Sequence, residues 1–496
     1  MRAIMVQGTG SSAGKTVFVA GVCRSLARRG FKVTPFKSQN MSLNSFVTKE
    51  GDEIAVAQAL QAFACGIDPK KEMNPILLKP KEDAVSQVIV LGKPVGNMNF
   101  NEYRGNFYEK ALEVIENSLN SLKNEYEVVV IEGAGNPAEI NIMDRDLANM
   151  KIAEIADANV ILIADIDKGG VFASIYGTYK LLPEKWRRRI KGIVINKFRG
   201  DKEILEPGLK EIEKRTGIPV IGIIPYHPTL SMPEEDSASL SERKWRSSGP
   251  IDCAVIWLPR ISNFTDIEPL DYEPSLSIRF VKLNEDLGEP DIIIIPGTRN
   301  TTEDLLKLKN SDVFKDILKF KGILIGICGG YQILGKKIED ENQLESKYGS
   351  VNGLGFLNAV TVFEKGEKIT QRLKGYVFSE EIFLKKIVGK ELKGFEIHEG
   401  TTYTEEEPFL RVKEGIGNNG DGFDGSVNGN VIGTYMHGLF ENDSFRSALV
   451  KHLCDIKGVD YIPSRKRGLD KRLNELSDII EKEVDFQRIL ELVYEV

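Results

Sequence analysis

Cys328 is the residue of this chain whose neighbours most clearly indicate chemistry. It follows the short apolar run Gly322–Ile327 and is flanked by Gly326, Gly329 and Gly330. Small residues on both sides permit the sharp strand-to-helix turn that lifts a nucleophile above a sheet. The N-terminus of the helix expected next favours the thiolate form. A lone cysteine on an apolar strand is commonly inert core, but the glycines favour a nucleophile here.

A thiolate nucleophile needs a proton shuttle and an oxyanion hole, and the sequence offers both. The apolar run that ends in Pro296-Gly297-Thr298 predicts a loop whose N–H groups, with that of Gly329, could bind an oxyanion. His437, one of four histidines, ends a later strand-like run and suits a general base. His452, in an amphipathic tail, is expected to be structural.

Residues 250–445, which hold these motifs, resemble class I glutamine amidotransferases. In that family a cysteine attacks the glutamine amide, ammonia leaves and water hydrolyses the thioester. Most members orient the histidine with a glutamate two residues later, but this chain has Leu439 there. The third member is therefore left open, with Glu441, Glu396 and Glu399 as candidates.

The N-terminus carries a phosphate-binding pattern. A strand-like run is followed by a glycine-rich loop and an amphipathic helical run, as in a P-loop. The spacing departs from the usual one, because Thr9 occupies the position of the first glycine. This half resembles dethiobiotin synthetase, which has the same longer spacing. The expected ATP-binding residues of the loop are Gly8, Thr9, Gly10, Gly14, Lys15 and Thr16, with Thr16 also a Mg²⁺ ligand.

Other charged residues of this half could serve phosphate chemistry. Glu132 ends a buried strand-like run and is expected to hold Mg²⁺ directly or through water. Lys37 ends another run, where a cation could steady a transferring phosphoryl group. The resemblance to dethiobiotin synthetase implies Glu53 as a second metal-side carboxylate. Asn196 and Lys197 stand where related folds contact the base.

Composition is typical of an intracellular enzyme. The chain has 496 residues, 28% of them charged, and a net charge of −7, so nucleic acid is not an expected partner. Its five scattered cysteines form neither a CxxC pair nor a disulfide framework, which favours the reducing cytoplasm. No apolar run approaches the length of a membrane span. The sequence carries no feature that specifies the oligomeric state.

The order of strand-like and helical runs predicts two α/β domains with mainly parallel sheets. We expect a P-loop domain at 1–230, a polar linker at 231–250, an amidotransferase domain at 251–445 and a helical tail at 446–496 that docks by its apolar face.

Four segments extend the resemblance over nearly the whole chain: FKSQNMSLNS, MNPILLKP, ADIDKGGVFAS and NKFRGD. They resemble the cobyric acid synthase family. That resemblance implies ATP- and glutamine-dependent amidation of the b, d, e and g carboxylates of adenosylcobyrinic acid a,c-diamide, with Mg²⁺. A cobyrinic acid a,c-diamide synthase and a partitioning-type nucleotide switch remain alternatives.

Overall fold

The structure, a computed structural model, describes residues 2–82, 85–227, 245–364, 368–464 and 468–495. By their contacts these residues fall into two compact units. The first unit comprises residues 2–42, 53–227 and 468–495, and the second unit comprises residues 43–52 and 245–464. Both units are therefore discontinuous in sequence.

A six-stranded parallel sheet, in the order β12-β11-β10-β1-β9-β2, forms the centre of the first unit. Because successive side chains of a strand point to opposite faces, Ile4 and Val6 enter one core and Ala3 and Met5 the other. Burial on both faces explains the continuous apolar runs seen in the sequence. The strands are β1 (Arg2–Gly8), β2 (Val33–Phe36), β9 (Val128–Glu132), β10 (Asn159–Asp165), β11 (Ile190–Phe198) and β12 (Val220–Pro225).

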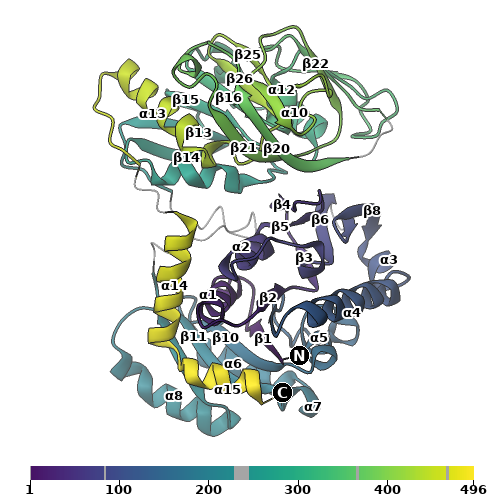
Figure 1. The fold of residues 1–496 in the computed structure, drawn as a ribbon, viewed down its shortest axis with the longest axis vertical. Helices are drawn as coiled ribbons and strands as arrows, with labels where there is room; N and C mark the ends of the chain where they lie inside the picture. The colour runs from purple at the N-terminus through teal and green to yellow at the C-terminus, as the bar shows by residue number, and fades with distance from the viewer. Residues whose placement is uncertain (1, 83–84, 228–244, 365–367, 465–467, 496) are drawn as a thin grey trace. The chain divides into compact units, whose positions relative to one another are not determined.

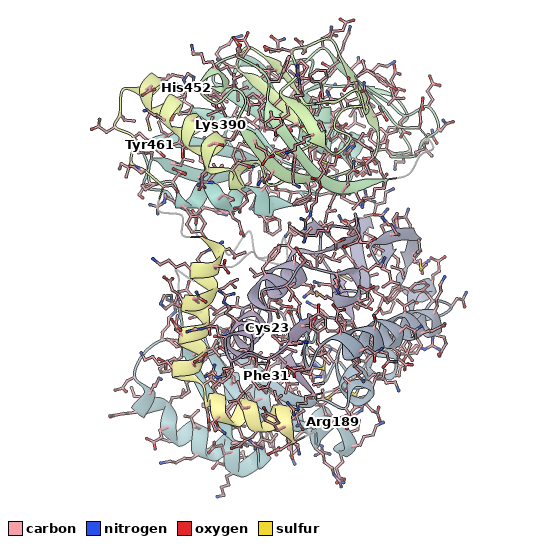
Figure 2. All side chains as sticks on the ribbon, viewed as in Figure 1. Cys23, Phe31, Arg189, Lys390, His452 and Tyr461 are labelled. Carbon is pink, nitrogen blue, oxygen red and sulfur yellow. The ribbon has the colours of Figure 1, made fainter. Side chains whose placement is uncertain are left out.

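Helices cover both faces of this sheet. On one face α1 (Lys15–Arg28) packs against α14 (Leu469–Glu483), which lies beside it in Figure 1, and α15 (Phe486–Tyr494) joins the same core. Cys23 of α1 is buried there (Figure 2). The opposite face is covered by α4 (Tyr108–Glu125), α5 (Met150–Ala156) and α6 (Val171–Leu181).

The other elements of the first unit are shorter or lie outside the central sheet. A second sheet has the order β3-β6-β7-β8. Its strands are β3 (Gln39–Met41), β6 (Ile76–Glu82), β7 (Val85–Val90) and β8 (Lys93–Asn99). The remaining elements are β5 (Glu53–Ala55), α2 (Val56–Ala64), α3 (Phe100–Arg104), α7 (Glu184–Arg187), α8 (Lys202–Thr216) and the 3₁₀ turns Lys71–Met73 and Met143–Arg145.

The second unit also has a six-stranded central sheet, in the order β14-β13-β15-β16-β26-β25, in which only the β25–β26 pair is antiparallel among the described strands. The carboxyl ends of its parallel strands meet at one edge, where sites are expected. The strands are β13 (Ile251–Trp257), β14 (Leu276–Lys282), β15 (Ile292–Ile295), β16 (Ile323–Ile327), β25 (Ser426–Asn428) and β26 (Val431–Thr434).

Two smaller sheets accompany the central one, in the orders β18-β17-β19-β22 and β21-β20-β23-β24. Their strands are β17 (Lys337–Glu339), β18 (Val351–Asn352), β19 (Ala359–Val362), β20 (Ile369–Val377), β21 (Glu391–His398), β22 (Thr401–Thr404), β23 (Leu410–Glu414) and β24 (Phe423–Asp424). The other elements are β4 (Ser45–Val47), α10 (Thr301–Lys309), α11 (Val313–Lys319), α12 (Gly329–Leu334), α13 (Asp443–Lys457) and the 3₁₀ helices η3 (Phe264–Tyr272), η4 (Leu384–Lys386) and η5 (Leu439–Glu441).

The predicted α/β class with mainly parallel sheets is confirmed by both central sheets. The expected tail, 446–496, is divided between the two units. Residues 446–457 belong to α13 of the second unit, whereas α14 and α15 belong to the first unit. His452 lies on α13, against Phe383 (Figure 2). The greater part of the predicted linker, 231–244, lies outside the described residues. Within the described ranges, none of the helices is long and apolar enough to cross a bilayer.

Candidate active sites

Cys328 stands at the turn between β16 and α12, with φ 54° and ψ −110°. A side chain rarely adopts this backbone region, so the turn is strained and must be held by its surroundings. A Cβ on Gly330 would clash with the carbonyl oxygen of Ile295, and one on Gly326 would lie 2.6 Å from Leu334 Cδ1. The Cys328 Sγ lies 3.4 Å from the Ile397 carbonyl oxygen, to which it donates. The structure therefore has the geometry of a nucleophile elbow.

His437 follows β26 and is held by a carboxylate that the sequence did not indicate. Its Nδ1 donates to Asp266 Oδ2 at 2.7 Å, and the N–H of Gly438 donates to Asp266 Oδ1 at 2.8 Å. His437 and Asp266 are buried, with 1% and 6% exposure. With the proton held on Nδ1, Nε2 is left as the ring nitrogen for the reacting atoms. That nitrogen makes no hydrogen bond within the described part of the chain.

The three glutamates suggested by the sequence are thus not the partner of the His437 ring. Glu396 instead accepts from the backbone N–H groups of Ile416 and Gly417 and lies 3.4 Å from His398 Nε2. The hydrogen bond from the His437 ring is accepted by Asp266 and not by Glu399 or Glu441. Asp266 is far from His437 in sequence and belongs to a 3₁₀ helix, η3, so no local spacing pointed to it.

The pKa of His437 reflects these neighbours. Burial lowers this pKa, but the neighbouring Asp266 carboxylate and Cys328 side chain raise it by more, so that the pKa rises to about 10. The imidazolium is therefore the stable form at neutral pH. A buried imidazolium beside a thiolate is the pair that a nucleophilic cysteine requires.

The two predicted oxyanion-hole glycines lie on adjoining backbone. A Cβ on Gly329 would lie 3.1 Å from the Thr298 nitrogen, and one on Gly297 would lie 3.3 Å from His437 Cε1. The Gly297 carbonyl accepts from the Ser262 N–H at 2.9 Å, which fixes this loop. The structure thus brings the β15 loop, the elbow and the histidine together in one unit.

Asp424 secures the strand that leads to His437. Its carboxylate accepts from the Thr434 hydroxyl and, at 3.1 Å, from the Tyr435 N–H. The side chain is fully buried. Burial raises its pKa to about 7, although the hydrogen bond from Thr434 opposes the shift.

In the first unit the P-loop joins β1 to α1, which begins at Lys15. Lys15 Nζ donates to the carbonyl oxygens of Gly10, at 3.0 Å, and Gly135, at 3.4 Å. Gly14 has φ +94°, and a Cβ there would clash with Asn196 Nδ2, so glycine is required. The loop predicted from Gly8 to Thr16 is therefore in place around the lysine ammonium.

Glu132, at the end of β9, gathers three of the neighbouring polar side chains. It accepts from Thr16 Oγ1 at 2.9 Å, from Lys37 Nζ at 3.0 Å and from Gln61 Nε2 at 2.5 Å. Glu132 and Lys37 are 0% and 3% exposed, so the buried carboxylate is neutralised by a buried ammonium. Gln61 had no signal in the sequence.

Two further predicted residues also lie at the loop. Asn196 Nδ2 donates to the Ala13 carbonyl and Lys197 Nζ to the Ser12 carbonyl, both at 2.9 Å. Glu53 has a different neighbour, because its Oε1 is paired with Lys79 Nζ at 2.6 Å in a buried ion pair. Lys79 lies in the MNPILLKP segment but was not predicted as a site residue.

Hard oxygen ligands suit Mg²⁺, which binds through one or two protein oxygens together with phosphate and water. The Thr16 hydroxyl and the Glu132 carboxylate, 2.9 Å apart, fit that donor set. In the described ranges no group of three or more histidine, cysteine, aspartate and glutamate side chains forms a metal cluster by itself.

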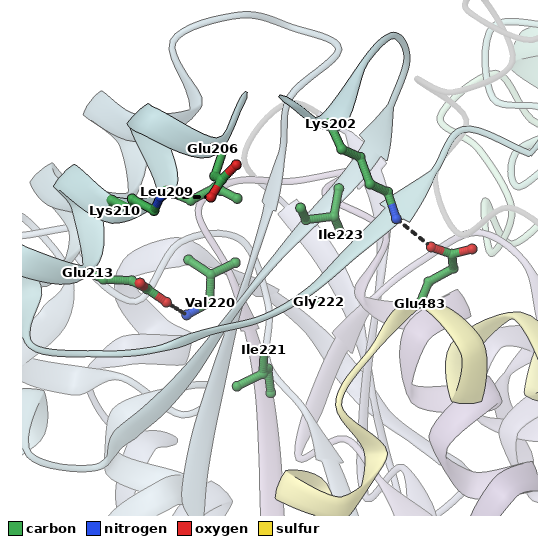
Figure 3. A pocket seen from close by; sticks show the side chains of 10 residues that line it. All are labelled: Lys202, Glu206, Leu209, Lys210, Glu213, Val220, Ile221, Gly222, Ile223 and Glu483. Atoms are coloured by element: carbon green, nitrogen blue, oxygen red, sulfur yellow. Dashed lines mark hydrogen bonds and ion pairs between the residues drawn. The ribbon is translucent and has the colours of Figure 1, made fainter. Parts of the chain in front are cut away.

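A separate hollow of about 340 Å³ lies along β12 and α8 (Figure 3). Four of its charged side chains form two ion pairs, Lys202 with Glu483 and Lys210 with Glu206, both at 2.7 Å. Glu213 accepts from the Val220 N–H at 2.7 Å. None of the predicted site residues lines it.

Two family models match the chain. Residues 4–240 match the CobQ/CobB/MinD/ParA nucleotide binding domain, and residues 252–445 match the CobB/CobQ-like glutamine amidotransferase domain.

Curated relatives match the full length. The probable cobyric acid synthase of Methanothermobacter thermautotrophicus is 53% identical over 99% of both chains. The cobyric acid synthase of Pelotomaculum thermopropionicum is 48% identical over 95% of this chain and 89% of its own. Among solved structures, that of PurLQS from Thermotoga maritima is 16% identical, with TM-score 0.33, over 42% of this chain and 99% of that chain.

Replacing Asp266 tests its role in orienting His437. Asp266→Asn should lower glutamine-dependent turnover by about 10³–10⁴-fold, because the amide cannot hold the correct tautomer or stabilise the imidazolium. Alkylation of Cys328 by iodoacetamide at neutral pH should slow in parallel. Glu441→Gln, which changes a sequence candidate that does not hold the ring, is the control and should retain turnover. Equal rates for the two variants would contradict this assignment.

Asp424 should make stability depend on pH. Between pH 4 and 7 the folded protein keeps a proton on this carboxyl that the unfolded chain has released, so stability falls as pH rises through this window. Asp424→Asn cannot ionise and should flatten that part of the curve, by up to about 4 kcal/mol. Denaturant unfolding of the two proteins across the window measures the difference. Parallel curves would assign the pH dependence to other groups.

Proposed function

Because the chain belongs to the cobyric acid synthase family, it is a glutamine-dependent amide ligase, and we propose that it amidates the b, d, e and g carboxylates of adenosylcobyrinic acid a,c-diamide. The product would be adenosylcobyric acid. The proposal is supported by a 53% identity to a probable cobyric acid synthase over 99% of both chains. It is also supported by the presence of the Asp266–His437 pair, the Cys328 elbow and the glycine-rich loop around Lys15 in this one chain.

Ammonia release belongs to the second unit in this proposal. The thiolate of Cys328 attacks the side-chain amide carbon of glutamine, and N–H groups of Gly297 and Gly329 bind the oxyanion. The imidazolium of His437 gives its proton to the departing ammonia. The neutral ring then removes a proton from the water that attacks the thioester, and the sulfur leaves as thiolate, which releases glutamate and restores the thiolate–imidazolium pair. Asp266 holds the ring in one orientation through both steps.

Carboxylate activation belongs to the first unit. A carboxylate is a poor acyl donor because its oxygen is a poor leaving group. Transfer of the terminal phosphoryl group of ATP to that oxygen gives an acyl phosphate, and ammonia then displaces phosphate to form the amide. Lys15 and the P-loop N–H groups bind the phosphates, and Lys37 stabilises the charge on the transferring group.

We assign Mg²⁺ to Thr16 and Glu132, where it would neutralise phosphate charge. Lys37 donates to Glu132 at 3.0 Å, and it would stabilise the transferring phosphoryl group if the carboxylate bound the metal. Glu53, which is paired with Lys79, would be a second carboxylate on the metal side, and Asn196 and Lys197 would contact the base.

Five buried free cysteines fit a reducing compartment, so we place the enzyme in the cytoplasm.

The nitrogen source separates the two halves of the reaction. Cys328→Ala should reduce glutamine-dependent synthesis by at least about 10³-fold yet leave synthesis from ammonium salt near the original rate, because the thiolate serves only glutamine hydrolysis. Lys15→Ala should abolish synthesis from both sources, because each needs the activated carboxylate. Equal loss from both sources in Cys328→Ala would refute this division of labour.

Product analysis identifies the substrate. One elbow and one P-loop supply a single ammonia source and a single activating site for all four carboxylates, so partly amidated products should dissociate and rebind. Mass spectrometry of early reaction mixtures should therefore show mono-, di- and triamidated intermediates, with glutamine consumed in proportion to amides formed. If the a,c-diamide stays unchanged while cobyrinic acid gains two amides, the chain is instead an a,c-diamide synthase.

A further inference from the structure

A short segment of the N-terminal half, Leu43–Asp52, belongs by its contacts to the second unit. The chain immediately before it and after it belongs to the first unit and contains Lys37 and Glu53, two of the proposed nucleotide-side residues. The segment therefore joins by covalent continuity the chain that supports ATP chemistry to the unit that carries Cys328. Its contacts show what it does there.

The first contact is with Asn263, the N-cap residue that immediately precedes η3. The Asn263 N–H donates to the Leu43 carbonyl at 3.3 Å, and the Ser45 N–H donates to Asn263 Oδ1 at 2.8 Å. Asn263 has left-handed backbone angles, φ 50° and ψ 39°, and its own carbonyl accepts from the Asp266 N–H at 2.9 Å. The segment thus binds the turn that places Asp266 against the imidazole.

The second contact reaches His437 through an aromatic ring. Phe46 packs on Phe395, with ring centroids 5.6 Å apart, and Phe395 stacks on the His437 ring at 5.3 Å and 22°. Phe395 and His437 also exchange both backbone hydrogen bonds, at 2.8 and 3.2 Å. Phe46 therefore supports Phe395, the ring that covers one face of the His437 imidazole.

The segment itself is internally ordered. The Thr48 N–H donates to the Asp52 carbonyl at 2.9 Å, and the Asp52 N–H donates to Thr48 Oγ1 at 3.1 Å. Gly51 has φ +79°, and a Cβ there would lie 3.0 Å from the Thr370 carbonyl of β20. This closed turn, together with the packing of β4 against β20 and β21, holds the backbone of Phe46 in place.

We propose that Leu43–Asp52 is a positioning element of the glutaminase site, which sets Asp266 through Asn263 and His437 through the Phe46–Phe395 pair. Glutamine hydrolysis then depends on a piece of chain whose two ends lead directly into the nucleotide-binding half. The proposal rests on the assignment of Cys328, His437 and Asp266 to glutamine hydrolysis. Phe46 and Asn263 are positioning residues, since they act through other side chains.

The test is made in the full-length enzyme with variants of Phe46. Phe46→Ala should lower kcat for glutamine hydrolysis by about 10–10²-fold with little change in KM, because a small displacement of the histidine affects the reaction more than binding. Phe46→Tyr keeps the ring and should restore kcat. Synthesis from ammonium salt should stay near the original rate in both variants, which also shows that the chain is folded.

Phe280→Ala is the matched control. Phe280 lies on the edge strand β14 of the same unit and, like Phe46, forms an aromatic pair, in its case with Trp257 of β13. Its loss should leave kcat for glutamine hydrolysis unchanged. Asn263→Gly, which keeps the left-handed backbone but removes the acceptor for Ser45, should lower kcat as Phe46→Ala does.

Equal kcat values for Phe46→Ala and Phe280→Ala, or a loss that Phe46→Tyr does not restore, would overturn the positioning role. Cys328→Ala distinguishes this outcome from failure of the proposed function. If that variant still hydrolyses glutamine, the assignment of the site itself is wrong. If it does not, while Phe46→Ala behaves as the original enzyme, only the role of the segment is refuted.

Discussion

The buried hydrogen bond between Asp266 and His437 is the interaction on which the proposed glutaminase site depends. A buried imidazolium would be unstable by itself, since burial lowers its pKa, and the carboxylate reverses that effect. The same carboxylate binds the Gly438 N–H, so that ring and backbone are fixed together. The strained backbone of Cys328 is useful only if its partner is held as firmly, and this pair supplies that rigidity.

A comparable constraint governs the first unit, where Glu132 accepts from Thr16, Lys37 and Gln61. Removing one partner of such a buried ion pair leaves an uncompensated charge and is costly. In the proposed reaction, phosphate would replace Glu132 as the partner of the Lys37 ammonium, and Mg²⁺ would replace Lys37 as the partner of the carboxylate. That exchange of ion-pair partners would leave neither buried charge uncompensated.

The sequence indicated those parts of both proposed sites that are encoded in consecutive residues. The Cys328 elbow and the loop ending in Thr16 each require particular residue types at fixed short spacings, because their turns tolerate few side chains. Asp266, Gln61 and Lys79 meet their partners only after the chain has folded, and a lone acid, amide or lysine has no distinctive local pattern. The tail was predicted as amphipathic, but periodicity shows only that a helix has an apolar face. It does not show which unit covers that face.

The segment Leu43–Asp52 shows the same limit at the level of domains. A boundary placed by composition assumes that each domain is one stretch of chain, and nothing in these residues is unusual enough to indicate otherwise. Their proposed role follows from their contacts in the folded chain. Ser45 contacts Asn263, which supports Asp266, and Phe46 contacts Phe395, which supports His437. Because two independent contacts converge on the proposed catalytic pair, Asp266 and His437, the position of this segment is better explained by the proposed site than by packing alone, for which either contact would suffice.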